Sequence, residues 1–146
     1  MQDDEPSPRN AHNRPPELTG VVTLLNDKLG TKETCAEVID SYEEIMRSIW
    51  SFLAQVLGNG GVRALLTRSA QLAVEQVPLL ETVQVRERDV DLSAFRTHTV
   101  PAPGVDCDTS EVMAALTHLT VVVFQTLSDM TGGTLVEPLL RFLEEA

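Results

Sequence analysis

The fold is decided by residues 37–72, EVIDSYEEIMRSIWSFLAQVLGNGGVRALLTRSAQL, because their pattern returns in residues 111–146, EVMAALTHLTVVVFQTLSDMTGGTLVEPLLRFLEEA. When residue 37 is set against residue 111, Gly58 falls on Gly132, and a Leu-Leu pair follows each glycine at the same distance. Each copy reads as a helix, a glycine that permits a turn, and a second helix. The sequence therefore predicts an all-α helical bundle of two helix–Gly–helix hairpins in a pseudo-twofold relation, preceded by a short N-terminal helix.

The first copy has apolar residues at steps of three and four, the spacing of a helix with one buried face. Thr31 or Thr34 can cap the start of this helix, and the glycine-rich residues 58–61 end it. A second helix is expected over residues 62–76, and Pro78 cannot continue it. The apolar stripe of the first, longer helix consists of Ile39, Tyr42, Met46, Ile49, Leu53 and Val56.

The long helix of the second copy is apolar nearly all round in its middle, at Val121, Val122, Val123 and Phe124. A helix of this kind is either buried on several sides or exposed at an oligomer interface. The first interpretation makes it the central helix of the bundle. The second predicts a homodimer formed through these four side chains, and both interpretations are kept.

The end of the second copy predicts one more helix. Met130 is the last apolar position of the long helix, and Gly132 and Gly133 break that helix. Thr134 and Glu137 have the spacing of a capping box, so a final helix is expected to start there.

The rest of the chain flanks or joins the two copies. Residues 1–16 are polar and rich in proline, which predicts a disordered tail ahead of a single helical domain over residues 17–146. A short helix is expected from Glu17 to Leu29. Residues 81–108 mix isolated valines with charges, prolines and a glycine, so we favour an irregular connection, with a short β-hairpin as the alternative.

The formal net charge of −11 limits the classes of molecule that the protein is expected to bind. It argues against nucleic acid and against an anionic membrane surface, both of which attract Lys and Arg. It suits a basic protein partner, although acidity also serves plain solubility. The N-terminus has no apolar signal region, and no stretch is apolar over the length of a membrane span, so the sequence predicts a cytoplasmic protein.

The chain has two cysteines, Cys35 and Cys107, which are too few for a disulfide framework or a zinc site. Both fall near the starts of equivalent helices in the two copies. A disulfide between them is therefore one interpretation, but two free thiols are expected in a reducing cytosol.

His118 is the sharpest candidate for chemistry, because a histidine in an apolar helix can bind a haem, another cofactor or a metal. Its neighbours two turns away, Glu111 and Gln125, are polar, and no second histidine or cysteine stands at ligand spacing. We therefore prefer a histidine at the surface or at an interface, and expect no metal and no cofactor. The glycines at residues 58–61 follow a helix and lack the Gly-Lys-Ser/Thr of a phosphate loop.

No catalytic constellation emerges from these residues, so we do not expect an enzyme. The sequence favours a non-enzymatic regulatory or scaffolding module that acts through protein contacts, as a homodimer and with a basic protein as a further partner. The alternative is a sensor domain that holds a small ligand or cofactor between bundle helices, near His118.

Overall fold

The computed structural model describes residues 16–100, 102 and 107–145, and they are mostly helical, which confirms the all-α class. The tail predicted for residues 1–16 lies outside the described residues, except for Pro16. In chain order the elements are α1 (Pro16–Leu29), α2 (Cys35–Gln76), the 3₁₀ helix η2 (Pro78–Thr82), β1 (Gln84–Val85), β2 (Val90–Asp91), α3 (Ser93–Thr99), α4 (Thr109–Thr131) and α5 (Val136–Glu145).

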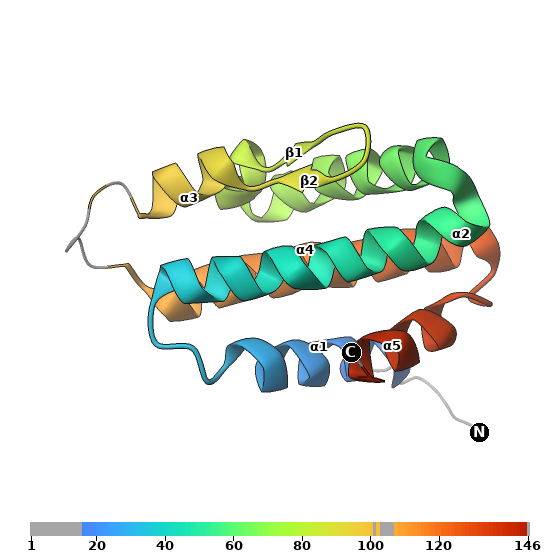
Figure 1. Ribbon diagram of the computed structural model, residues 1–146, viewed down its shortest axis with the longest axis horizontal. Helices are drawn as coiled ribbons and strands as arrows, with labels where there is room; N and C mark the ends of the chain where they lie inside the picture. The colour runs from blue at the N-terminus through green and yellow to red at the C-terminus, as the bar shows by residue number, and fades with distance from the viewer. Residues whose placement is uncertain (1–15, 101, 103–106, 146) are drawn as a thin grey trace, which may run out of the picture.

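Helix α2 consists of two helical arms joined by a sharp turn at Gly58, whose φ of 73° and ψ of 164° are not helical. A positive φ favours glycine because glycine has no Cβ to clash with the backbone. We call residues 35–57 the first arm and residues 59–76 the second arm. The glycine break predicted from the sequence is therefore where the chain reverses (Figure 1).

Both long helices start at a side-chain cap, and Thr34 is one of the two residues predicted to cap the first. At α2 the Thr34 hydroxyl accepts a hydrogen bond from the Glu37 N–H at 3.1 Å, and the Glu37 carboxylate accepts one from the Thr34 N–H at 3.1 Å. This reciprocal capping box satisfies two N–H groups that the helix itself leaves unpaired. At α4 the Asp108 carboxylate accepts from the N–H groups of Ser110 and Glu111.

The elements form three layers, as Figure 1 shows. In the middle layer the first arm of α2 and α4 run side by side and in the same direction, and they make the most extensive helix contact of the described chain. Helices α1 and α5 form the layer on one side. The second arm of α2, the two short strands and α3 form the layer on the other side, where η2 packs against α2 and α3.

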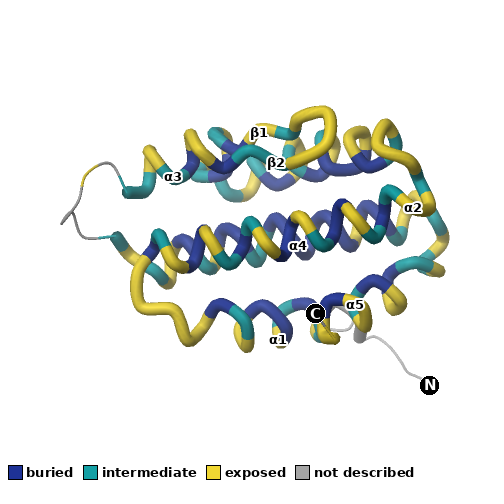
Figure 2. The backbone as a smooth tube through the Cα atoms, in the orientation of Figure 1, coloured by how far each residue is buried: buried dark blue, intermediate teal, exposed yellow. Residues whose placement is uncertain are grey.

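The hydrophobic core runs along the middle layer and is covered from both sides (Figure 2). It is largely aliphatic, with Tyr42, Phe95 and Phe124 as its largest fully buried side chains. Helix α4 is long and apolar enough, by length and composition, to cross a bilayer, but 61% of its most apolar window is buried inside the bundle. That burial explains its apolar composition.

Residues 81–108 contain more regular structure than expected. β1 and β2 pair antiparallel, with Gln84 opposite Asp91 and Val85 opposite Val90, so the short hairpin alternative is present. The seven-residue helix α3, which buries Phe95, follows it and was not predicted. A single buried aromatic ring anchors this helix, and one residue gives no periodic signal.

The capping box predicted at α5 is absent. The Thr134 hydroxyl donates to the Thr131 carbonyl at 3.2 Å, and the Glu137 carboxylate accepts from Arg141 at 2.5 Å. Both side chains are therefore used in other interactions, and the helix begins at Val136.

Candidate functional site

The four residues predicted as an interface, Val121, Val122, Val123 and Phe124, are all buried within a single chain. Helix α4 packs against α1, α2 and α5, so it is the central helix of the bundle. The exposed apolar surface on which the dimer interpretation rested is therefore not found at these positions. A homodimer remains a prediction, but it has to use other side chains.

Large exposed apolar side chains lie elsewhere in the described chain. Val56 is 57% exposed and Met130 is 53% exposed, although the helical spacing predicted that both face inward. Each lies two residues before the glycine that ends its helix, at the end of the bundle where the chain turns (Figure 1). Periodicity gives the face on which a residue lies, but not how far the neighbouring helix extends along that face.

One partly exposed group of apolar residues spans two helices. The rings of Phe52, on the first arm of α2, and Phe142, on α5, lie 5.2 Å apart with a tilt of 43°. Val56 is one helical turn beyond Phe52 and so shares its face of α2. Phe142 is 39% exposed despite this contact. We call Phe52, Val56 and Phe142 the aromatic seam.

A hollow of about 620 Å³ along α5 continues the aromatic seam, because Phe142 belongs to both. Its carboxylates are those of Glu137, which pairs with Arg141, and Glu145, which forms no ion pair within the described part of the chain. The seam is thus apolar in the middle and acidic along α5. The residues lining the hollow are Gly133, Thr134, Glu137, Pro138, Arg141, Phe142 and Glu145.

His118 lines a groove of about 500 Å³ between α1 and α4, and Val121 lines the same groove. The structure therefore brings one predicted ligand residue and one predicted interface residue together. The His118 side chain is half-buried, and its Nε2 atom is buried without a hydrogen-bond partner in the described structure. The remaining lining residues are Val22, Asn26, Ser110, Met113, Ala114 and Thr117.

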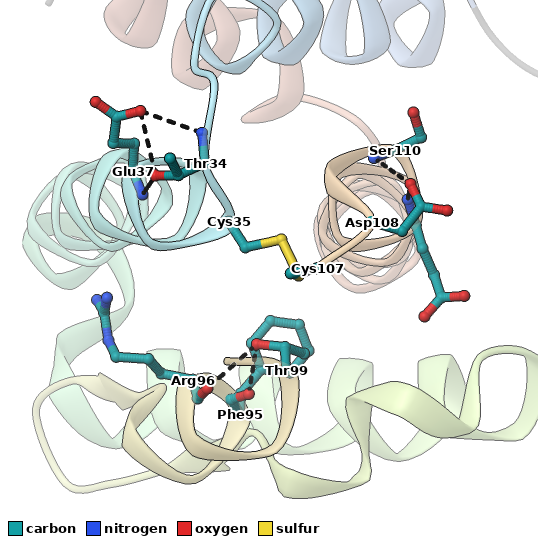
Figure 3. Close-up of a disulfide and its surroundings, with 10 residues drawn as sticks. Thr34, Cys35, Glu37, Phe95, Arg96, Thr99, Cys107, Asp108 and Ser110 are labelled. Carbon is teal, nitrogen blue, oxygen red and sulfur yellow. Dashed lines mark hydrogen bonds between the residues drawn. A yellow bond between two sulfur atoms is a disulfide. The ribbon is translucent and has the colours of Figure 1, made fainter. Parts of the chain in front are cut away.

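Cys35 and Cys107 form a disulfide, so the expectation of two free thiols is wrong. The bond joins the starts of the two central helices, between the cap at Thr34 and the cap at Asp108 (Figure 3). Helices that run in the same direction bring their starts to the same end of the bundle, which is why the two cysteines meet. Neither sulfur is available as a nucleophile while the bond is intact.

The aromatic seam was missed at the sequence level. Leu139 and Leu143 are buried on the inner side of α5, which leaves Phe142 on its outer side. A large aromatic residue on the outward face of an amphipathic helix was the available signal. Its contact with Phe52 joins residues 90 positions apart (142 − 52), and no local pattern reports such a contact.

The described residues contain no group of three or more His, Cys, Asp or Glu side chains placed to hold a metal ion. Comparisons of the chain with protein-family models, with curated protein sequences and with solved structures found no match. The features of the described chain that bear on its function are the aromatic seam, the hollow along α5, the groove at His118 and the acidic charge.

Proposed function

We propose that the protein is a non-enzymatic interaction module that binds a basic, amphipathic segment of a partner protein at the aromatic seam. The observation that carries this proposal is the pair of half-buried Phe52 and exposed Phe142 beside a hollow with an acidic rim. Aromatic side chains are enriched at the energetic centres of protein interfaces. An amphipathic helix can place its apolar face on such a surface, as in helix-in-groove recognition.

Charge complementarity favours a basic occupant. The chain carries a formal charge of −11, and Glu145 on the rim is not neutralised within the described chain. Lys or Arg residues flanking the apolar face of a partner would meet these carboxylates, which raises the association rate and selects against acidic partners.

A model peptide provides the test. We would use a fluorescein-labelled peptide with Leu and Lys at helical spacing, and measure its binding by anisotropy at low and high salt. Replacing Phe142 and Val56 together by Ser should weaken binding by roughly tenfold or more, since these side chains supply the apolar contact. Leu72→Ser is the matched control, because Leu72 is an exposed apolar residue of the second arm, outside the seam.

Two results would count against the proposal. One is equal binding by the Phe142/Val56 double variant and the parent protein. The other is that a matched peptide in which Glu replaces Lys binds as tightly as the Lys peptide, because charge complementarity would then not contribute to binding.

We also propose that the two hairpins are related by a pseudo-twofold axis. Gly58 and Gly132, which coincide in the sequence alignment, both have a positive φ, 73° and 74°, although their ψ values of 164° and 19° differ. The exposed Val56 and Met130 coincide as well, and so nearly do Cys35 and Cys107. Failure of residues 37–72 to superpose on residues 111–145 in an experimental structure would contradict this relation.

Self-association is a second use of the seam, and it keeps the predicted homodimer as a proposal. Two copies that each carry a charge of −11 repel one another, so we expect dimerisation to strengthen as salt screens that repulsion. Sedimentation velocity at low and high salt tests this expectation. A protein that stays monomeric at both, at high concentration, contradicts it.

The groove between α1 and α4 supports a second candidate function, a sensor for a small apolar ligand. The unpartnered Nε2 of His118 would be satisfied by a ligand that carries a hydrogen-bonding group. Mass spectrometry of organic extracts from purified protein, compared with a His118→Ala variant, tests this role. Extracts without any ligand that depends on His118 would contradict it.

A further inference from the structure

The two residues of the disulfide differ in their access to solvent. Cys35 is the first residue of α2, packs into the core and is only 3% exposed. Cys107 lies just ahead of the Asp108 cap of α4 and is partly exposed at the edge of the core. A molecule that approaches from solvent therefore reaches Cys107 more easily than Cys35.

This difference decides where a thiol reacts with the bond. A thiolate attacks one of the two sulfurs of a disulfide, and access decides which one. Attack on Cys107 forms a bond from the incoming sulfur to Cys107 Sγ while the bond to Cys35 Sγ breaks. Cys35 leaves with the electron pair as a thiolate and takes up a proton from water. One disulfide replaces another, so the step needs no further oxidant or reductant.

The charged side chains that flank the bond along the chain are mostly acidic. On the α4 side the carboxylates of Asp108 and Glu111 are exposed. On the α2 side those of Glu33 and Glu37 are exposed, and Lys32 is the single cation of residues 31–37. Four carboxylates thus stand against one ammonium group.

Arg96, the cation that Figure 3 shows near the disulfide, is already paired. Its guanidinium group lies 2.5 Å from the carboxylate of Asp40 and 3.4 Å from that of Glu43. Two carboxylates meet this one guanidinium group, so it adds no positive surplus. The bond therefore lies in a negative field, which repels anionic thiolates and favours thiols that carry a positive charge.

We propose that the disulfide is a thiol-exchange site at which a cationic thiol forms a mixed disulfide with Cys107 and releases Cys35 as a free thiol. The thiol belongs either to a small aminothiol or to a cysteine that Lys or Arg flanks in a basic peptide. The chemistry of both is the same, a sulfur with a positive charge close to it.

The residue that is attacked can be mapped with cysteamine. Samples taken early in the reaction are quenched with acid, alkylated with iodoacetamide, digested and analysed by mass spectrometry. We expect cysteamine on Cys107 and the alkyl group on Cys35, in at least about tenfold excess over the reverse. Urea below the unfolding transition should not accelerate the reaction, because the folded protein is attacked.

Three thiols of similar size test the charge preference. The thiolates of cysteamine, 2-mercaptoethanol and 2-mercaptoethanesulfonate carry zero, one and two net negative charges. Each rate of disulfide loss is divided by the rate of the same thiol with uncharged hydroxyethyl disulfide, which removes differences in intrinsic reactivity. At low salt the corrected rate of cysteamine should exceed that of the sulfonate by about tenfold or more, and high salt should reduce this ratio.

Asp108→Asn tests the origin of that preference, because asparagine still caps a helix but carries no charge. The ratio of the corrected cysteamine and sulfonate rates should fall about threefold in this variant. Asp129→Asn is the matched control, since it makes the same change at an exposed position of α4 about 30 Å away. It should leave the ratio nearly unchanged.

Two peptides distinguish the sources of the thiol. They are acetyl-Lys-Cys-Lys-amide and the matched acetyl-Glu-Cys-Glu-amide. Faster exchange by the Lys peptide assigns the site to cysteines of basic peptides as well, and exchange by cysteamine without the Lys peptide confines it to small aminothiols.

Single-cysteine variants decide the attacked residue if the mixed disulfide closes again before the acid quench. The Cys107 thiol of a Cys35→Ala variant should react with cystamine at least about tenfold faster than the Cys35 thiol of a Cys107→Ala variant. The reverse order would overturn the proposal.

Other results would overturn it too. They are a cysteamine adduct chiefly on Cys35, equal corrected rates for the three thiols, equal ratios for the Asp108→Asn and Asp129→Asn variants, and exchange that accelerates steeply in low urea. None of them bears on the aromatic seam, since Phe52 is 17 residues (52 − 35) along α2 from Cys35, or roughly 25 Å. This site and the proposed function can therefore fail independently.

Discussion

The hydroxyl oxygens of Tyr42 and Thr120 lie 2.7 Å apart in the buried contact between the first arm of α2 and α4. The Thr120 hydroxyl also lies 2.9 Å from the Leu116 carbonyl, to which it donates its proton. Tyr42 is therefore the donor to Thr120. Burial raises the pKa of the Tyr42 phenol above its usual value, so it keeps this proton throughout the physiological range.

The direction of this hydrogen bond predicts unequal effects of two conservative substitutions. Tyr42→Phe removes the donor, but Thr120 still donates to Leu116, so the cost should be about 1 kcal/mol of unfolding free energy. Thr120→Val leaves the fully buried Tyr42 hydroxyl without an acceptor and should cost about 1–3 kcal/mol. Urea denaturation of both single variants and of the double variant measures the difference. A larger cost for Tyr42→Phe than for Thr120→Val would show that the assigned direction is wrong.

Reduction of the Cys35–Cys107 disulfide should destabilise the fold. The bond joins residues 72 positions apart, so it restricts a large part of the unfolded chain. We expect the loss to be roughly 2–4 kcal/mol, measured as a lower urea midpoint in the presence of a reductant. A Cys35→Ala/Cys107→Ala variant should be as unstable as the reduced protein and should not respond to reductant. If reductant lowered the urea midpoint of that variant as much as that of the parent protein, loss of the disulfide would not be the cause.

The disulfide also bears on the cytoplasmic location, which stays a prediction. Disulfides persist in oxidising compartments and are rare in a reducing cytosol. Acid quenching followed by alkylation, applied to cells, counts free thiols before they can react. In a cytosolic protein both cysteines should be alkylated, whereas protection of both would place the protein in an oxidising compartment.

Two glycines of α2 should respond in opposite ways to alanine. Gly58 has a φ of 73°, at which an added Cβ is strained although nothing lies within 4 Å of it, so Gly58→Ala should cost about 1 kcal/mol or more. Gly60 lies in the helical second arm and also has open space around it. Gly60→Ala should therefore stabilise the protein by about 0.4–1 kcal/mol. Thermal denaturation of the Gly58→Ala and Gly60→Ala variants shows whether each change lowers or raises the stability. A stabilising Gly58→Ala would contradict the positive φ assigned to Gly58 at the turn.

The capping box makes the stability of the fold depend on pH in the acidic range. Hydrogen bonds from the N–H groups of Glu33 and Thr34 lower the pKa of Glu37 below its usual value of 4.5. The unfolded chain therefore takes up this proton at a higher pH than the folded chain does. The contribution of Glu37 is fully present above pH 4.5 and is lost as the pH falls through the lower pKa of the folded state.

Substitution of Glu37 tests that dependence. Glu37→Gln keeps an acceptor for the cap but does not titrate, so its stability should fall less between about pH 5 and pH 3 than that of the parent protein. Glu75→Gln is the control, since Glu75 is an exposed carboxylate of α2 that makes no hydrogen bond within the described chain. Identical pH profiles for the Glu37→Gln and Glu75→Gln variants would contradict the prediction.

Local features of the fold were predictable from the sequence because they depend on neighbouring residues. The breaks at Gly58 and Gly132 and the caps at Thr34 and Asp108 follow from backbone chemistry within one turn. The apolar all-round middle of α4 was also recognised. Its placement at the centre of one chain, rather than between two chains, depends on what packs against it, and a helical pattern does not contain that information.

Tertiary features explain the remaining differences. The aromatic seam depends on α5 folding back along the first arm of α2, which brings Phe142 to Phe52. The hollow of about 660 Å³ between the first arm of α2 and the β1–β2 hairpin depends on the hairpin lying over α2, so its lining combines Arg47 with Arg86 and Arg88. Each combines side chains that are far apart in the sequence, so neither leaves a periodic signal.

The bond between Cys35 and Cys107 turns the intervening chain into a closed ring. That ring contains both arms of α2, the hairpin and α3, while α1 leaves it at one cysteine and α4 leaves it at the other. A protease that nicks the exposed hairpin after Arg88 would open the ring without releasing a fragment. The molecule can thus survive a cut there as one covalent piece, until a reductant separates its halves.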